Sequence, residues 1–146
     1  MTNINWGRWL AGGLIASVIA FATDGFLHQR VIRGEWDALA AGLQIVMQEH
    51  SPLAFVYFAI YELGRGFLAL FAYLMMRERL GAGPKTAVWA GIVSWLAFSV
   101  AGPAQFIPLG LFNETLWIMA GGYQLVASIL AAVAGAAVYR EPRSRG

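Results

Sequence analysis

Residues 53–76 read LAFVYFAIYELGRGFLALFAYLMM, an apolar run that contains two opposite charges, Glu62 and Arg65. A helix of about 20 apolar residues crosses the hydrocarbon core of a bilayer, and the middle of this run falls between the two charges. Each central charge disfavours insertion by about 2.5–3.5 kcal/mol, whereas each Leu, Ile, Phe or Val returns only about 0.3–0.6 kcal/mol. The two sums nearly cancel, so we expect Glu62 and Arg65 to pair with each other or to be sheltered by neighbouring helices. Ionisable groups at this depth are usually functional.

The composition predicts an all-α integral membrane protein with one domain over residues 1–146. Of the 146 residues, 59% are hydrophobic and 12% are charged, whereas about 25% are charged in a typical soluble domain. The chain has no Cys, which excludes disulfides, thiolate metal sites, iron–sulfur clusters and Cys nucleophiles. It has no basic block interleaved with aromatic residues, so we expect the lipid bilayer and not nucleic acid as a partner.

Four apolar stretches are long enough to cross a membrane as helices, at about residues 9–27, 53–76, 87–107 and 116–139. The Lys and Arg residues outside the spans divide unequally between the two sides of this arrangement. Seven fall on one side, Arg8, Arg77, Arg79, Lys85, Arg140, Arg143 and Arg145, and two on the other, Arg30 and Arg33. The positive-inside rule then predicts that both termini are cytoplasmic.

In general form the chain resembles small four-span bacterial membrane proteins, which implies the bacterial inner (cytoplasmic) membrane. A competing interpretation treats Arg8, the first apolar run and Ala20-Phe21-Ala22 as a cleavable signal peptide. Loss of the first span would spoil the charge asymmetry, so we favour an uncleaved helix.

The segment 29–51 is too polar to span the membrane. Trp36, Leu39, Leu43 and Met47 recur in it at helical spacing, with acidic and amide residues between them. This pattern predicts an amphipathic helix on the outer membrane surface between the first and second spans. A connecting helix that covers the spans is favoured over a lid that binds a partner.

The outer end of the third span contains Pro103, which removes a backbone donor and clashes with the preceding turn. We expect a kink or a break there, with the freed carbonyl groups bonded to protein or water.

Polar residues of all four spans fall in the outer half of the membrane. Glu62 and Arg65 are three apart and share a helix face, with the Tyr61 hydroxyl nearby. Gln124 lies at a similar depth in the fourth span, so we expect it to reach the Glu62 and Arg65 pair. Asp24 and His28 share a face of the first span, and Gln105 lies near the end of the third. Together they predict an outward-opening polar pocket that binds a substrate or ion. The alternatives are a structural ion pair at Glu62 and Arg65 and a solvated interfacial pair at Asp24 and His28.

The two histidines suggest a further possibility. His28 ends the first span and His50 precedes the second, so both belong to the outer interface. Paired imidazoles bind haem or a metal ion, although no HExxH motif supports such a site.

The leading hypothesis is a non-enzymatic multipass membrane protein, because the chain lacks nucleophile, phosphate-binding and dinucleotide-binding motifs. It would act as an accessory or assembly subunit of a membrane-protein partner, or as a homo-oligomer. The alternative is a small transporter or channel with Glu62 and Arg65 at its midpoint. The third hypothesis is a haem- or metal-binding redox protein that uses His28 and His50.

Overall fold

The computed structural model describes residues 4–47 and 51–139, and in these residues the secondary structure is helical, with no strands. Four helices make up most of it: α1 (Trp6–Phe26), α3 (Pro52–Leu80), α4 (Pro84–Trp95) and α6 (Glu114–Val138). Four shorter elements complete it: the π-helical segments η1 (Leu27–Val31) and η2 (Leu96–Ala101), and the short helices α2 (Arg33–Leu43) and α5 (Gly102–Ala104).

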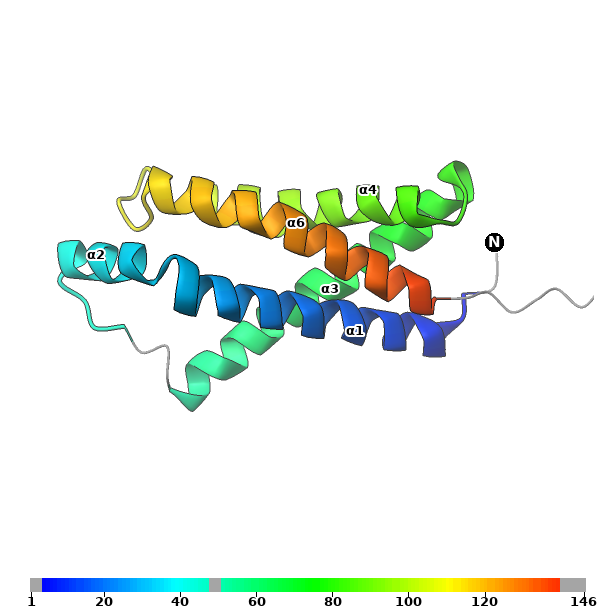
Figure 1. Ribbon diagram of the computed structural model, residues 1–146, viewed down its shortest axis with the longest axis horizontal. Coiled ribbons are helices and arrows are strands. Elements are labelled where there is room, and N and C mark those ends of the chain that lie inside the picture. The colour runs from blue at the N-terminus through cyan, green and yellow to red at the C-terminus, as the bar shows by residue number, and fades with distance from the viewer. Residues whose placement is uncertain (1–3, 48–50, 140–146) are drawn as a thin grey trace, which may run out of the picture.

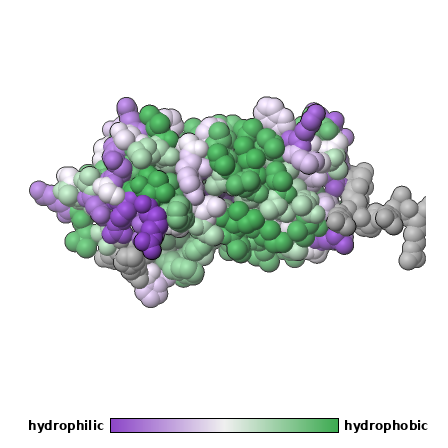
Figure 2. Space-filling view, in the orientation of Figure 1, coloured by the Kyte–Doolittle hydropathy of each residue, from purple (hydrophilic) through white to green (hydrophobic). Residues whose placement is uncertain are grey.

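Four continuous helical stretches are long and apolar enough to cross a membrane, which confirms the number of spans expected from the sequence. They cover Trp6–Val31, Pro52–Leu80, Pro84–Ala104 and Glu114–Val138. Hydrophobic side chains gather over the middle of the face seen in Figure 2, and hydrophilic side chains lie toward both ends. These features fit a small membrane protein.

The four long helices form an antiparallel bundle in which α1 packs against α3 and α6, and α4 packs against the same two helices. The start of α1, the end of α6 and the α3–α4 turn lie at one end of the bundle, here called the hairpin end (Figure 1). α2 and the turn before α6 lie at the opposite end, here called the α2 end. α3 crosses the bundle diagonally, so that its first half diverges from the other helices (Figure 1).

Polar caps fix the starts of the long helices. The side chains of Asn5, Ser51 and Asn113 each accept a hydrogen bond from the backbone N–H three residues later, which satisfies a donor that the first helical turn leaves unpaired. At the α3–α4 turn, Gly81 adopts φ 82° and Gly83 adopts φ 148°, backbone conformations that favour glycine. Pro84 then begins α4 with the fixed φ that a first helical turn requires.

Small residues bring the helices close together at the hairpin end. A methyl group added to Gly12 of α1 would lie 2.6 Å from the Gly135 carbonyl oxygen of α6, and one added to Gly91 of α4 would lie 2.8 Å from the Ser128 carbonyl oxygen of α6. Gly66 of α3 packs directly on Ser17 of α1. Such contacts gain dispersion energy where no hydrophobic effect drives helix association.

The helix expected between the first two spans is shorter than predicted. α2 ends at Leu43, because Gln44 adopts a left-handed backbone conformation (φ 55°) that closes the helix. Met47 therefore lies beyond the helix that its spacing suggested. Figure 1 shows α2 continuing past α1 along the long axis of the molecule. Trp36 and Leu39 pack against the buried Leu27, Ile32 and Leu116 side chains.

The third span leaves α-helical geometry before Pro103, at η2, and it ends at Ala104, earlier than the predicted residue 107. The turn before the proline is π-helical, so that the Gly102 N–H donates to the Ala97 carbonyl group five residues earlier. In that pattern the Phe98 carbonyl group would bond to the nitrogen of Pro103, which carries no hydrogen. The Tyr61 hydroxyl group donates to this carbonyl oxygen at 2.8 Å instead.

Candidate functional site

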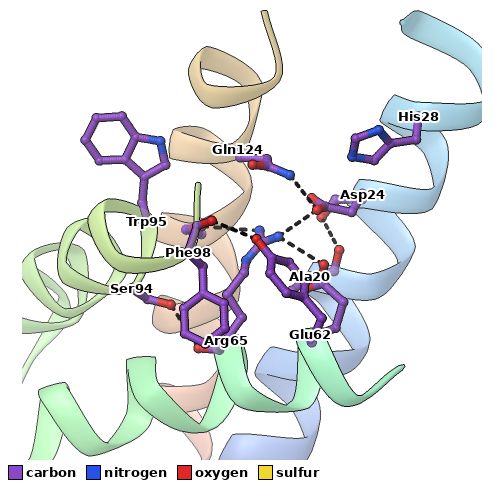
Figure 3. Close-up of polar contacts among 12 residues, drawn as sticks. Ala20, Asp24, His28, Glu62, Arg65, Ser94, Trp95, Phe98 and Gln124 are labelled. Atoms are coloured by element: carbon purple, nitrogen blue, oxygen red, sulfur yellow. Dashed lines mark hydrogen bonds and ion pairs between the residues drawn. The ribbon is translucent and has the colours of Figure 1, made fainter. Parts of the chain in front are cut away.

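Arg65 is the centre of a buried polar cluster that joins the four long helices, and its side chain is 1% exposed. Its Nη1 donates to Asp24 Oδ2 of α1 at 2.7 Å and to Glu62 Oε1 of α3 at 3.1 Å, and its Nη2 donates to Ser128 Oγ of α6 at 3.3 Å (Figure 3). From α4, Ser94 Oγ donates to the Arg65 carbonyl oxygen at 2.9 Å. The cost of burying this guanidinium group is thus offset by two carboxylates and a hydroxyl group.

Asp24 links α1 to α6 as well as to α3. Its Oδ2 atom accepts from Gln124 Nε2 at 2.6 Å as well as from Arg65. We expected Gln124 to reach the Glu62 and Arg65 pair, and the structure joins it to that pair through Asp24. The expected neighbour of Asp24 was His28, yet the carboxylate bonds to Arg65 on a different helix.

Both carboxylates keep one oxygen atom without a hydrogen bond. Asp24 Oδ1 and Glu62 Oε2 are buried and have no partner within residues 4–47 and 51–139, and the same holds for Ser99 Oγ of η2. Buried polar atoms in native proteins are nearly always bonded, so three such atoms at one place indicate strain, an unseen water molecule or a binding site.

These three residues line a cavity of about 740 Å³, which is within the size range of ligand-binding pockets. Its innermost wall includes Asp24, Glu62 and Gln124, and the half-buried Arg33 and the exposed Gln105 line it near the α2 end. Most of the remaining lining is apolar, with aromatic side chains from α1, α2, α3, η2, α6 and the loop before α6: Phe21, Trp36, Phe58, Phe98, Trp117 and Phe112. The cavity is therefore a largely apolar chamber whose inner end, here called the floor, carries the carboxyl groups of Asp24 and Glu62.

Two π-helical segments shape this cavity. η1 contributes His28 and Gln29 to its lining, and η2 contributes Phe98 and Ser99. π-turns inside helices are frequent at functional sites because the extra residue re-aims the side chains that follow. Tyr61 fixes the second of them, both by its hydrogen bond to Phe98 and by an edge-to-face ring contact with the Phe98 ring (centroids 5.2 Å apart).

His28 lies in the cavity wall, and its Nδ1 accepts a hydrogen bond from Trp36 Nε1 at 2.7 Å. An indole N–H can only donate, so Nδ1 carries no proton and the ring is neutral, with its hydrogen on Nε2. His50 lies outside the described residues, and the pairing of the two histidines stays a prediction. Within the described part of the chain, no three His, Cys, Asp or Glu residues are grouped as a metal ion requires.

Gln105 lies at the exposed end of the cavity, where its Nε2 donates to the Gly102 carbonyl oxygen at 2.9 Å. It does not reach the buried cluster. The cluster instead contains two residues that the sequence analysis missed, Ser94 and Ser128. Gln124 and Ser128 are four residues apart, so the helical period offered a signal for Ser128. The phenylalanine and tryptophan side chains of the lining were not predicted to belong to the site.

We compared the chain with protein-family models, curated proteins and solved structures, and none of them matches it.

Proposed function

We propose that this chain is a small membrane carrier that binds a solute in the cavity between its helices. The observation that carries the proposal is the charged floor of a 740 Å³ chamber, where buried carboxylate oxygens lack partners within the described residues. Buried polar atoms without partners are rare in native proteins, and the two residues that carry these oxygen atoms line the chamber. This proposal places the transport alternative ahead of the accessory role that the sequence favoured.

The tight packing at the hairpin end supports a carrier over an open channel. The cavity lining includes no residue of that end, where Gly12 meets Gly135 and Gly66 meets Ser17 in backbone-level contact. A channel needs a continuous path, whereas a carrier exposes its site to one side at a time. This structure would be the state that is accessible from the α2 end.

We further propose that the α2 end faces the outside of a bacterial inner membrane. Arg8, Arg77, Arg79 and Lys85 belong to the hairpin end, whereas Arg30 and Arg33 belong to the α2 end. This asymmetry supports cytoplasmic termini. The cavity would then open away from the cytoplasm.

A second candidate, association with a partner helix or a second copy, is supported by the first half of α3. Leu53, Phe55, Val56, Phe58 and Ile60 are all exposed on it. Either lipid or another protein would cover this apolar surface. A mass measurement of the protein in a mild detergent distinguishes an oligomer from a monomer.

The carrier proposal is tested by solute-driven currents in proteoliposomes on a solid-supported membrane. A panel of cationic, neutral and anionic organic solutes is applied to the wild type, Glu62→Gln and Glu114→Gln. Glu114 is exposed at the start of α6 and does not line the cavity, so its variant removes a charge without touching the site.

We expect at least one solute to drive a current in the wild type and in Glu114→Gln, and the current to vanish in Glu62→Gln at equal protein content. A current that persists unchanged in Glu62→Gln, or a wild type that moves no member of the panel, would contradict the proposal.

A further inference from the structure

With both of its carboxyl groups ionised, the floor of the cavity carries one more negative than positive charge. Asp24 Oδ2 and Glu62 Oε1 both accept from the same atom, Nη1 of Arg65. One guanidinium group therefore faces two carboxylates, and the formal charge of the ionised trio is −1. Asp24 is 7% exposed and Glu62 is 4% exposed, so bulk water screens this excess poorly.

The other ionisable groups in the cavity wall do not cancel the excess. The His28 ring is neutral because its Nδ1 accepts from Trp36. The guanidinium group of Arg33 is exposed near the α2 end, where it pairs with Asp37 (Nε–Oδ1 3.0 Å). Tyr61 adds a neutral hydroxyl group that is bonded to Phe98. The cluster residues from α6, Gln124 and Ser128, carry no charge.

Each of the two carboxylates has one oxygen atom that is available to accept a hydrogen bond from a ligand. Asp24 Oδ1 and Glu62 Oε2 are acceptors without a donor in the described part of the chain, and both residues line the chamber. Figure 3 shows Asp24 and Glu62 pointing toward the Arg65 guanidinium group from two helices, and Gln124 pointing toward Asp24 from a third. A ligand with N–H donors, or with a compact positive charge, would complete the set.

The walls above the floor suit an organic cation better than a metal ion. Phe21, Phe98, Trp36, Phe112 and Trp117 line the chamber, and aromatic faces attract ammonium groups through their electron-rich π systems. The lining offers apolar surface to a hydrocarbon body and only two carboxylates to a charge. A divalent metal ion needs more oxygen ligands than these, and an anion would meet the excess negative charge.

We infer that the cavity takes a monovalent organic ammonium ion with an aromatic or apolar body, whose charged nitrogen lies against Asp24 and Glu62. The inference rests on the proposed solute-binding function and names its substrate class. The ammonium group replaces the missing donors of Oδ1 and Oε2, and its charge brings the floor to neutrality. The body of the ligand occupies the aromatic chamber toward the α2 end.

The test uses three probes with one body and three charges: 4-phenylbutylammonium, 4-phenyl-1-butanol and 4-phenylbutyrate. Binding to the full chain in lipid nanodiscs is measured by isothermal titration calorimetry, with empty nanodiscs as the reference for partition into lipid. We expect the ammonium probe to bind about ten-fold more tightly than the alcohol, the difference that one charge-assisted hydrogen bond makes. The carboxylate probe should bind more weakly than the alcohol.

The variants then assign the preference to the floor of the cavity. Glu62→Gln should weaken the ammonium probe about ten-fold and leave the alcohol unchanged, whereas Glu114→Gln should change neither. The ratio of the dissociation constants of the ammonium and alcohol probes is measured on the wild type alone. It therefore tests the inference even when Glu62→Gln does not fold.

Equal or tighter binding of the alcohol or of the carboxylate probe would overturn the cation inference and leave a solute-binding cavity in place. Failure of all three probes to bind at millimolar concentration would also overturn it. The proposed carrier function would then be decided separately by the currents of the wider panel.

Discussion

The two halves of this bundle are built from the same four helices but are packed in opposite ways. At the hairpin end, Gly12, Gly66 and Gly91 let neighbouring backbones touch. At the α2 end, large aromatic side chains hold the helices apart, and the first half of α3 diverges from the bundle (Figure 1). The Arg65 cluster lies where one type of packing gives way to the other. A four-helix membrane fold can thus be tightly packed at one end, where small residues meet, and hollow at the other, where large aromatic residues line a cavity.

The largest expected effect is the loss of Arg65, which lies at the boundary between the halves. Arg65→Met would leave Asp24 and Glu62 buried without a counter-charge, and we expect a loss of about 3–5 kcal/mol in the free energy of unfolding. Titration with a denaturing detergent measures it. Arg79→Met, an exposed position on the same helix, is the matched control.

The triple variant Asp24→Asn, Glu62→Gln, Arg65→Met should recover much of this loss, because it removes all three charges together. A triple variant less stable than Arg65→Met would show that the cluster is not held by charge pairing.

The next prediction compares the two halves of the bundle at two glycines of one helix, α1. A methyl group on Gly12 would lie 2.6 Å from a backbone oxygen of α6, whereas nothing lies within 4 Å of one on Gly25. We expect Gly12→Ala to lower the free energy of unfolding by about 1–3 kcal/mol, because α1 and α6 must separate.

Gly25→Ala should be neutral or stabilising by up to about 1 kcal/mol, because alanine favours the helix. Thermal unfolding in detergent micelles measures both variants. Equal unfolding temperatures for the two variants would mean that packing does not differ between the halves.

The contrast between the halves also explains what the sequence could and could not predict. Length and hydropathy were enough for four helices, and Pro103 was enough to place a break in the α-helical pattern of the third span. The spacing of Glu62 and Arg65 put them on one face of a helix. In each case the cause lies within one segment of the chain.

Contacts between segments were harder to predict. Gly66 of α3 makes the close contact with α1, whereas Gly64, two residues earlier, is exposed. The spans are apolar all round, so their sequence gives little sign of which face turns inward. For the same reason the bond from Asp24 to Arg65 was not foreseen, because it depends on the rotation of α1 against α3. The cavity depends on the divergence of α3, which no single segment encodes.

A smaller effect is expected at η2, the π-helical segment that lines the hollow half. Tyr61→Phe removes the donor to the Phe98 carbonyl oxygen and should cost about 1 kcal/mol, the net value of one such bond. Tyr57→Phe, on the same helix and 64% exposed, is the matched control and should cost less.

The cost of Tyr61→Phe should shrink in the background Pro103→Ala, because alanine restores an N–H for the same carbonyl group. A double-mutant cycle on the free energy of unfolding measures the coupling. Independent effects of the two substitutions would show that Tyr61 does not replace the bond that Pro103 removes.

The smallest effect is expected at α2, which packs on the hollow half through apolar contacts. Trp36 packs on Phe112 and His28, whereas the ion pair of Arg33 and Asp37 has side chains that are 38% and 58% exposed. Exposed pairs four residues apart on a helix contribute only about 0.3–0.5 kcal/mol, and salt screens them. Asp37→Asn should therefore change the free energy of unfolding by no more than this amount, and the change should fall further in 1 M salt. A larger loss that persists at high salt would mean that α2 is held to the bundle by charge, and that the two halves differ in their chemistry as well as in the size of their side chains.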